Sequence, residues 1–162
     1  MSTLLKFEIV KHEPYRFIGK SVYARAGMQC GQGNFCDYLW SNSKWVFEHL
    51  DGLKGYSTNE VKNAALLTWE KYDDKSKLLG YTVGRFMKVD TPVPDGMDYF
   101  DIADGYVAKG YFDTYDGNEE GLMREAIEKH GEYSSAHWRF MVEIGEFEKE
   151  PGFVYYISCD KK

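Results

Sequence analysis

The chain has 162 residues, 43% of them hydrophobic, so it is long and apolar enough to form one domain, residues 1–162, with a buried core. Its net charge is −6 and its basic residues stand singly among acidic ones, which argues against a protein that binds nucleic acid directly. The N-terminal residues lack the pattern of a signal peptide, and no apolar run approaches the roughly 20 residues that span a bilayer. We therefore expect a cytoplasmic protein without a direct nucleic-acid or membrane partner.

The first part of the chain predicts strands around one helix. Helical spacing of apolar residues predicts a helix over residues 34–53, with Asn34 as its N-cap. Gly19 interrupts an extended segment and predicts a bulge or a close approach of two backbones. The extended segments are predicted over residues 5–14, 15–27, 64–74 and 78–89.

After the Pro-containing connection DTPVPDG, residues 90–96, the same order of elements recurs. A helix is predicted over residues 118–131, with Asn118 as its N-cap. We therefore expect an α+β fold made of two pseudo-twofold βαββ repeats, with an antiparallel sheet, two helices on one face and a ligand cleft on the other. The predicted extended segments are residues 101–117, 138–148 and 151–160, and the predicted halves are about 1–90 and 97–162.

Glu143 is an acidic residue inside the apolar strand WRFMVEIGEFE, residues 138–148. Side chains alternate along a strand, so we expect one row to meet the helices and the other to face the open side of the sheet. If that side is solvent, Glu143 is an ordinary exposed acid; if it is a cleft, a cationic ligand would offset the desolvation of the carboxylate. The row expected to meet the helices is Trp138, Phe140, Val142 and Ile144, and the other row is Arg139, Met141, Glu143 and Gly145.

Aromatic residues are abundant, with 13 Tyr, 10 Phe and 4 Trp, and some of them are candidates for a cleft wall. An offset of 72 residues, which matches Gly80 with Gly152, places Trp69 opposite Met141. A register error of one residue would instead put Trp69 in the core. Tyr106 and Tyr111 are further candidates, although packing in a sheet explains each ring equally well.

Catalytic and metal-binding patterns are weak in this sequence. The three cysteines form no CxxC motif and share no metal-ligand spacing with histidine, so we expect free thiols, no metal and no cofactor. No Ser-His-Asp or Cys-His arrangement is visible. The histidines are widely spaced and are expected at the surface or at helix caps; they are His12, His49, His130 and His137.

Several stretches together resemble the GyrI-like family, also called the AraC-type effector-binding or multidrug-binding domain. They are FEIVKHEPYRFIGKSVYARAG, WEKYDD, LLGYTVGRF, ADGYVAKGYFDTYDG, and MVEIG followed by GFVYYISCD. The resemblance implies two βαββ units around a cleft that holds lipophilic cations or flat aromatic compounds, with Glu143 as the acid of the site. It places Trp69 and Tyr111 in the wall, and Gly145 stands where the family usually has Tyr, which would enlarge the pocket.

The resemblance leaves more than one function open. We expect a stand-alone protein that senses or sequesters an aromatic, cationic compound, since no helix-turn-helix segment precedes the first strand. The alternative is a hydrolase of strained, cyclopropane-type electrophiles, with Glu143 as the base. A protein partner such as DNA gyrase and a haem-binding role, as in SOUL-like proteins of similar fold, are weaker alternatives; no histidine has an obvious haem-ligating context.

Overall fold

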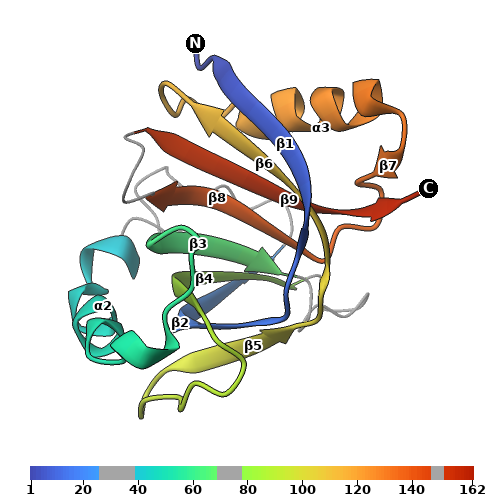
Figure 1. Ribbon diagram of the computed structural model, residues 1–162. Coiled ribbons are helices and arrows are strands. Elements are labelled where there is room, and N and C mark those ends of the chain that lie inside the picture. The colour runs from blue at the N-terminus through green and yellow to red at the C-terminus, as the bar shows by residue number, and fades with distance from the viewer. Residues whose placement is uncertain (26–38, 69–77, 147–151) are drawn as a thin grey trace.

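A computed structural model describes residues 1–25, 39–68, 78–146 and 152–162, whose strands form a nine-stranded antiparallel sheet (Figure 1). The α+β class is therefore confirmed. No helix within these ranges is long and apolar enough to cross a bilayer. The strands are β1 (Leu4–His12), β2 (Tyr15–Arg25), β3 (Asn63–Thr68), β4 (Leu78–Met87), β5 (Asp98–Ile102), β6 (Gly105–Phe112), β7 (Tyr133–Ser134), β8 (Phe140–Glu146) and β9 (Phe153–Lys161). The helices are α2 (Lys44–Asp51), the 3-10 helix η1 (Lys54–Tyr56) and α3 (Glu119–His130).

The strands follow one another in the sheet in the order β1-β6-β9-β8-β3-β4-β2-β5, with β7 paired to β9. Each end of the sheet joins strands from distant parts of the chain, because β1 pairs with β6 and β5 pairs with β2. The prediction of one extended segment over residues 101–117 is wrong. β5 ends at Ile102 and β6 begins at Gly105, so the chain turns at Ala103 and Asp104 and the two strands lie far apart in the sheet order.

The predicted helix over residues 34–53 is interrupted in its described part. Residues 39–41 are helical, and α2 begins only at Lys44. The Ser43 hydroxyl donates to the carbonyl of Leu39, and serine and asparagine side chains that bond to nearby backbone favour caps and turns over helix interiors. The predicted cap Asn34 lies outside the described residues.

Two layers of side chains lie on opposite faces of the sheet, since neighbours on a strand alternate between them. On one face, α3 packs Met123 and Ile127 onto strand residues such as Ile157, and α2 packs Val46 and Leu50 near Ile18. On the opposite face lies a cluster that we call the inner cluster. It consists of Phe17, Val61, Ala64, Leu66, Phe86, Phe100, Ile102, Val107, Phe140, Val142, Val154 and Tyr156.

The face prediction for β8 is wrong. Phe140 and Val142 belong to the inner cluster, whereas Met141 belongs to the cluster on the other face, which includes Met123 and Ile127 of α3. Both rows of this strand are apolar, so alternation alone could not show which row the helices cover. In addition, Ala65 pairs with Ile144 and Leu66 with Val142, so Glu143 is the extra residue of a β-bulge that interrupts the alternation.

Glycines bring two strands close together at one point of the sheet. Gly19 of β2 pairs with Gly84 of β4, and a Cβ on Gly19 would lie 2.1 Å from the carbonyl oxygen of Val83. The predicted close approach at Gly19 is therefore confirmed, because no side chain would fit there. Of the three cysteines, Cys159 is free and buried, and the other two lie outside the described residues.

Candidate functional site

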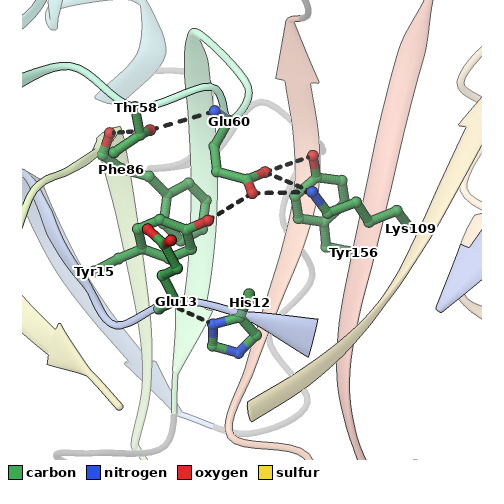
Figure 2. A network of polar contacts seen from close by, with 8 residues as sticks. All are labelled: His12, Glu13, Tyr15, Thr58, Glu60, Phe86, Lys109 and Tyr156. Atoms are coloured by element: carbon green, nitrogen blue, oxygen red, sulfur yellow. Dashed lines mark hydrogen bonds and ion pairs between the residues drawn. The ribbon is translucent and has the colours of Figure 1, made fainter. Parts of the chain in front are cut away.

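A buried carboxylate, Glu60, lies at the centre of a polar network on the inner side of the sheet (Figure 2). Its side chain is only 9% exposed. The Tyr15 hydroxyl donates to Oε1 at 2.8 Å, the Tyr156 hydroxyl donates to Oε2 at 3.0 Å, and the Lys109 ammonium lies 2.9 Å from both oxygens. Such charge-assisted bonds offset the large cost of removing a carboxylate from water.

The elements around Glu60 explain why these groups meet. Lys109 of β6 and Tyr156 of β9 are directly paired in the sheet, so their side chains are neighbours on one face, and the ammonium lies 5.0 Å from the Tyr156 ring centroid. Glu60 stands in the loop before β3. The Glu60 backbone N–H donates to the Thr58 hydroxyl, which donates to the carbonyl of Phe86, so the loop is tied to β4.

Aromatic rings adjoin this network. Phe86 meets the rings of Tyr15, Phe17 and Phe140 at centroid distances of 5.4, 4.9 and 6.0 Å. Burial and the Glu60 carboxylate both raise the pKa of Tyr15 above its ordinary value, as they do for Tyr156. Both phenols therefore keep their protons at neutral pH and remain donors to Glu60. The arrangement combines one anion, one ammonium, two hydroxyls and several ring faces.

His12 connects this region to Arg139. The Glu13 carbonyl can only accept, so Nδ1 of His12 carries the proton of the 2.8 Å bond between them. The Arg139 guanidinium can only donate, so Nε2, at 3.1 Å, is unprotonated and the imidazole is neutral. Burial lowers the pKa of His12, and the charge of Arg139 lowers it further. The prediction of a surface or capping role is wrong for His12, which is only 3% exposed.

Glu143 lies on the α3 side of the sheet. Its carboxylate accepts a hydrogen bond of 2.8 Å from the Tyr115 hydroxyl. Burial raises the pKa of Glu143, the bond from Tyr115 opposes that rise, and the carboxylates of Glu120 and Glu119 on α3 add to it. Glu143 is thus a largely desolvated acid on the opposite face from the inner cluster. Its role in binding stays a prediction.

The other predicted site residues do not gather around Glu143 as one wall. Met141 and Tyr106 both belong to the α3 side, where Tyr106 meets Tyr133 at a centroid distance of 5.4 Å. Tyr111 instead packs against the inner cluster. Trp69 lies outside the described residues. Gly145 faces the inner cluster, but a Cβ there would lie 2.6 Å from Val154, so neighbouring valines fill the space that was expected to enlarge a pocket.

Sequence reasoning missed Glu60 because a single acid in a loop has no periodicity to mark it. Lys109 did carry a usable signal. It stands between Val107 and Tyr111 on the inward-facing row of β6, so it is a charge on an apolar row, like the one that drew attention to Glu143.

Two cavities border the inner cluster. One has a volume of about 490 Å³ and the other of about 360 Å³. Within the described ranges, no group of three or more His, Cys, Asp and Glu side chains is arranged to hold a metal ion. The larger cavity is lined by Leu50, Asp51, Lys54, Ser57, Thr58, Glu60, Val61, Lys62, Arg85 and Phe86. The smaller one is lined by Thr68, Asp101, Ile102, Ala103, Trp138, Arg139 and Phe140.

Solved structures share this fold. SAV2435, whose structure was determined bound to tetraphenylphosphonium, matches with a TM-score of 0.64 at 8% identity, over 98% of this chain and 94% of its own. A Vibrio cholerae integron cassette protein matches with a TM-score of 0.51 at 10% identity, over 99% of both chains. A Staphylococcus aureus MU50 protein assigned to bacterial transcription regulation matches with a TM-score of 0.53 at 11% identity, over 97% of this chain and 98% of its own.

No family model matches the sequence, and no curated protein matches it. At identities of 8–11%, the structural likeness shows the fold alone.

Proposed function

We propose that this protein binds a small aromatic cation on the inner side of its sheet, with Glu60 as the counter-ion. The observation that carries the proposal is a carboxylate only 9% exposed, held among hydroxyls and next to ring faces. The two strands that supply Tyr15 and Tyr156 come from opposite ends of the chain. The proposal includes membership of the GyrI-like family and the division into related halves, about 1–90 and 97–162. The tetraphenylphosphonium bound to SAV2435 supports this ligand class.

The ammonium of Lys109 occupies the position that a ligand cation would take. It lies 2.9 Å from both oxygens of Glu60 and 5.0 Å from the Tyr156 ring centroid, which is cation recognition by a carboxylate and a ring. The flexible stem of lysine allows its ammonium to move toward water when a ligand arrives. A lipophilic cation loses less hydration than an ammonium on entering such a site, so the exchange favours ligands with delocalised or shielded charge.

The alternative function, hydrolysis of strained electrophiles with Glu143 as the base, rests on one observation. Burial raises the pKa of Glu143 above its ordinary value even though the hydrogen bond from Tyr115 opposes the rise, and a raised pKa favours a carboxylate as a base. Glu143 is not among the described residues that line either cavity, however, so binding at Glu60 is the proposal that the geometry supports better.

Calorimetric titration with tetraphenylphosphonium, and with neutral triphenylphosphine oxide as a comparison ligand, tests the proposal. The proteins are the wild type, Glu143→Gln and the double variant Glu60→Gln/Lys109→Met, which removes both charges of the pair and so leaves neither one buried alone. The control is Glu128→Gln, an exposed acid on α3.

We expect the wild type to bind tetraphenylphosphonium more tightly than triphenylphosphine oxide. In the double variant the ratio of the two affinities should fall by about tenfold, which corresponds to roughly 1.4 kcal/mol. Glu143→Gln and Glu128→Gln should bind as the wild type does. If only Glu143→Gln weakens the binding, the carboxylate predicted from the sequence is the anchor and Glu60 is not. If the wild type binds neither compound, the proposed ligand class is wrong.

A further inference from the structure

The smaller cavity, of about 360 Å³, lies where β3 and β5 end and β8 begins. It shares none of its described lining residues with the cavity beside Glu60. Its walls are mainly apolar and come from Ile102, Ala103, Trp138 and Phe140, and two polar residues among the lining, Thr68 and Arg139, could bind a ligand.

The first of these groups is the Thr68 hydroxyl. Thr68 is only 2% exposed, and its Oγ1 is a buried side-chain atom for which the described structure provides no hydrogen-bond partner. Buried hydroxyls are normally paired, because leaving one unpaired is costly. Thr68 lines the cavity, although its Oγ1 is closed off from solvent in this structure. A rotation about χ1, which exchanges the hydroxyl and the methyl group, would present this hydroxyl to an oxygen of a bound molecule.

The second group is the Arg139 guanidinium, which is held by neutral acceptors. It donates to the carbonyl of Ala103 at 3.1 Å and to Nε2 of the neutral His12 at 3.1 Å. Gly105 admits it, because a Cβ at that position would lie 2.3 Å from its Nη2.

Arg139 forms no ion pair with a described residue. The acid that lines the same cavity, Asp101, is already paired with Arg16 at 2.8 Å. Arg139 is therefore a cation at this cavity without an ion-pair partner among the described residues.

We propose that this cavity binds a small organic carboxylate. Its carboxylate would accept from Arg139 and Thr68, and its apolar body would lie against Ile102, Trp138 and Phe140. A bare inorganic anion would leave the apolar walls uncovered, and the Arg139 charge would repel a cation. This site is separate from the cation site at Glu60, so either can exist without the other.

The test compares 2-naphthoate with the neutral 2-naphthylmethanol by calorimetry. Four proteins are needed: the wild type, Arg139→Met, Thr68→Val, and, as a control, Arg124→Met, which changes an arginine of α3 that does not line this cavity. We expect the wild type to bind the carboxylate at least tenfold more tightly than the alcohol. Arg139→Met should lose this preference, and Arg124→Met should keep it. Thr68→Val should weaken naphthoate several-fold while raising the melting temperature of the free protein, since valine removes an unpaired buried hydroxyl without changing the shape.

The proposal is overturned if the wild type binds the carboxylate no better than the alcohol, or if folded Arg139→Met binds naphthoate as tightly as the wild type. Should Arg139→Met fail to fold, Thr68→Val decides alone, and unchanged naphthoate affinity in that variant contradicts the site. Tetraphenylphosphonium should not displace naphthoate; displacement would show that the two ligands share one site and would contradict the separation proposed here.

Discussion

Glu60 and Glu143 are both removed from water, on opposite faces of the same sheet, and they are stabilised differently. Glu60 is surrounded by an ammonium and two phenolic hydroxyls. Glu143 accepts from one phenol, Tyr115, and lies near two further carboxylates that raise its pKa. Burial of a carboxylate alone therefore does not identify a site that binds a cation. What distinguishes Glu60 is a cation that reaches it from a distant strand.

The largest effect expected from this comparison is at Lys109. Lys109→Met leaves Glu60 buried without its cation, and breaking a buried ion pair by removing one partner costs about 3 kcal/mol of unfolding free energy. Urea unfolding at pH 7 measures this loss. Glu60→Gln/Lys109→Met, which removes both charges, should be clearly more stable than the single variant; equal stability of the two would show that the pair is not coupled.

The tyrosine that donates to Glu60 should contribute more to stability than the one that donates to Glu143. Tyr156→Phe removes a hydroxyl from the charged Glu60 and should cost about 1.5 kcal/mol, because hydrogen bonds to charged groups are the stronger ones. Tyr115→Phe should cost less, because Glu143 can take up a proton once its donor is gone. Paired denaturation curves for the two variants give the difference, and a larger loss for Tyr115→Phe would reverse the ranking.

The two faces should also respond to acid in opposite directions. The pKa of His12 is lowered in the folded protein, so the unfolded chain binds its proton first, and stability from this group is lost as the pH falls below about 6.5. The pKa of Glu143 is raised in the folded protein, so the folded protein binds this proton at a higher pH than the unfolded chain does. The ionised carboxylate therefore lowers stability at neutral pH, and this loss disappears as the pH falls toward the ordinary pKa of a glutamate. His12→Gln should weaken the first dependence. The measurement is the unfolding free energy of wild type and variant between pH 7 and pH 4. If the loss of stability with falling pH is the same in both, His12 is not the group that causes it.

The smallest effect is expected for Glu143→Gln. Glutamine still accepts from Tyr115 and carries no charge near Glu119 and Glu120, so at pH 7 the variant should gain less than about 1 kcal/mol of stability. Thermal melts at pH 7 and pH 4.5 test this, with the gain confined to the higher pH. A clear loss of stability at pH 7 would mean that the ionised carboxylate has a favourable partner in the folded protein.

Local patterns in the sequence were enough for the class of the fold and for most strands. Alternating side chains and turn residues predict β4, β8 and β9. Apolar residues at helical spacing, followed by a glycine, predict α3, and that glycine, Gly131, ends the helix with a positive φ of 80°. The face of β8 could not be predicted, because both of its rows are apolar and the bulge at Glu143 depends on its pairing with β3. The interruption before α2 depends on a Ser43 side-chain bond that competes with the helix.

The site was harder to predict than the fold, because it depends on long-range pairing. Glu60 becomes a candidate only when β6 and β9 bring Lys109 and Tyr156 next to it, and no spacing in the sequence encodes that meeting. The sequence pointed instead to Glu143, because an acid is conspicuous on an apolar strand. The role of Glu143 in binding stays a prediction.

The central claim is that Lys109 occupies the position of a ligand cation at Glu60. The most direct test is calorimetric titration of tetraphenylphosphonium into folded wild type and folded Lys109→Met at pH 7. If the claim holds, removing the internal competitor leaves Glu60 without a cation, and Lys109→Met binds the ligand at least tenfold more tightly. Equal or weaker binding by Lys109→Met would contradict it.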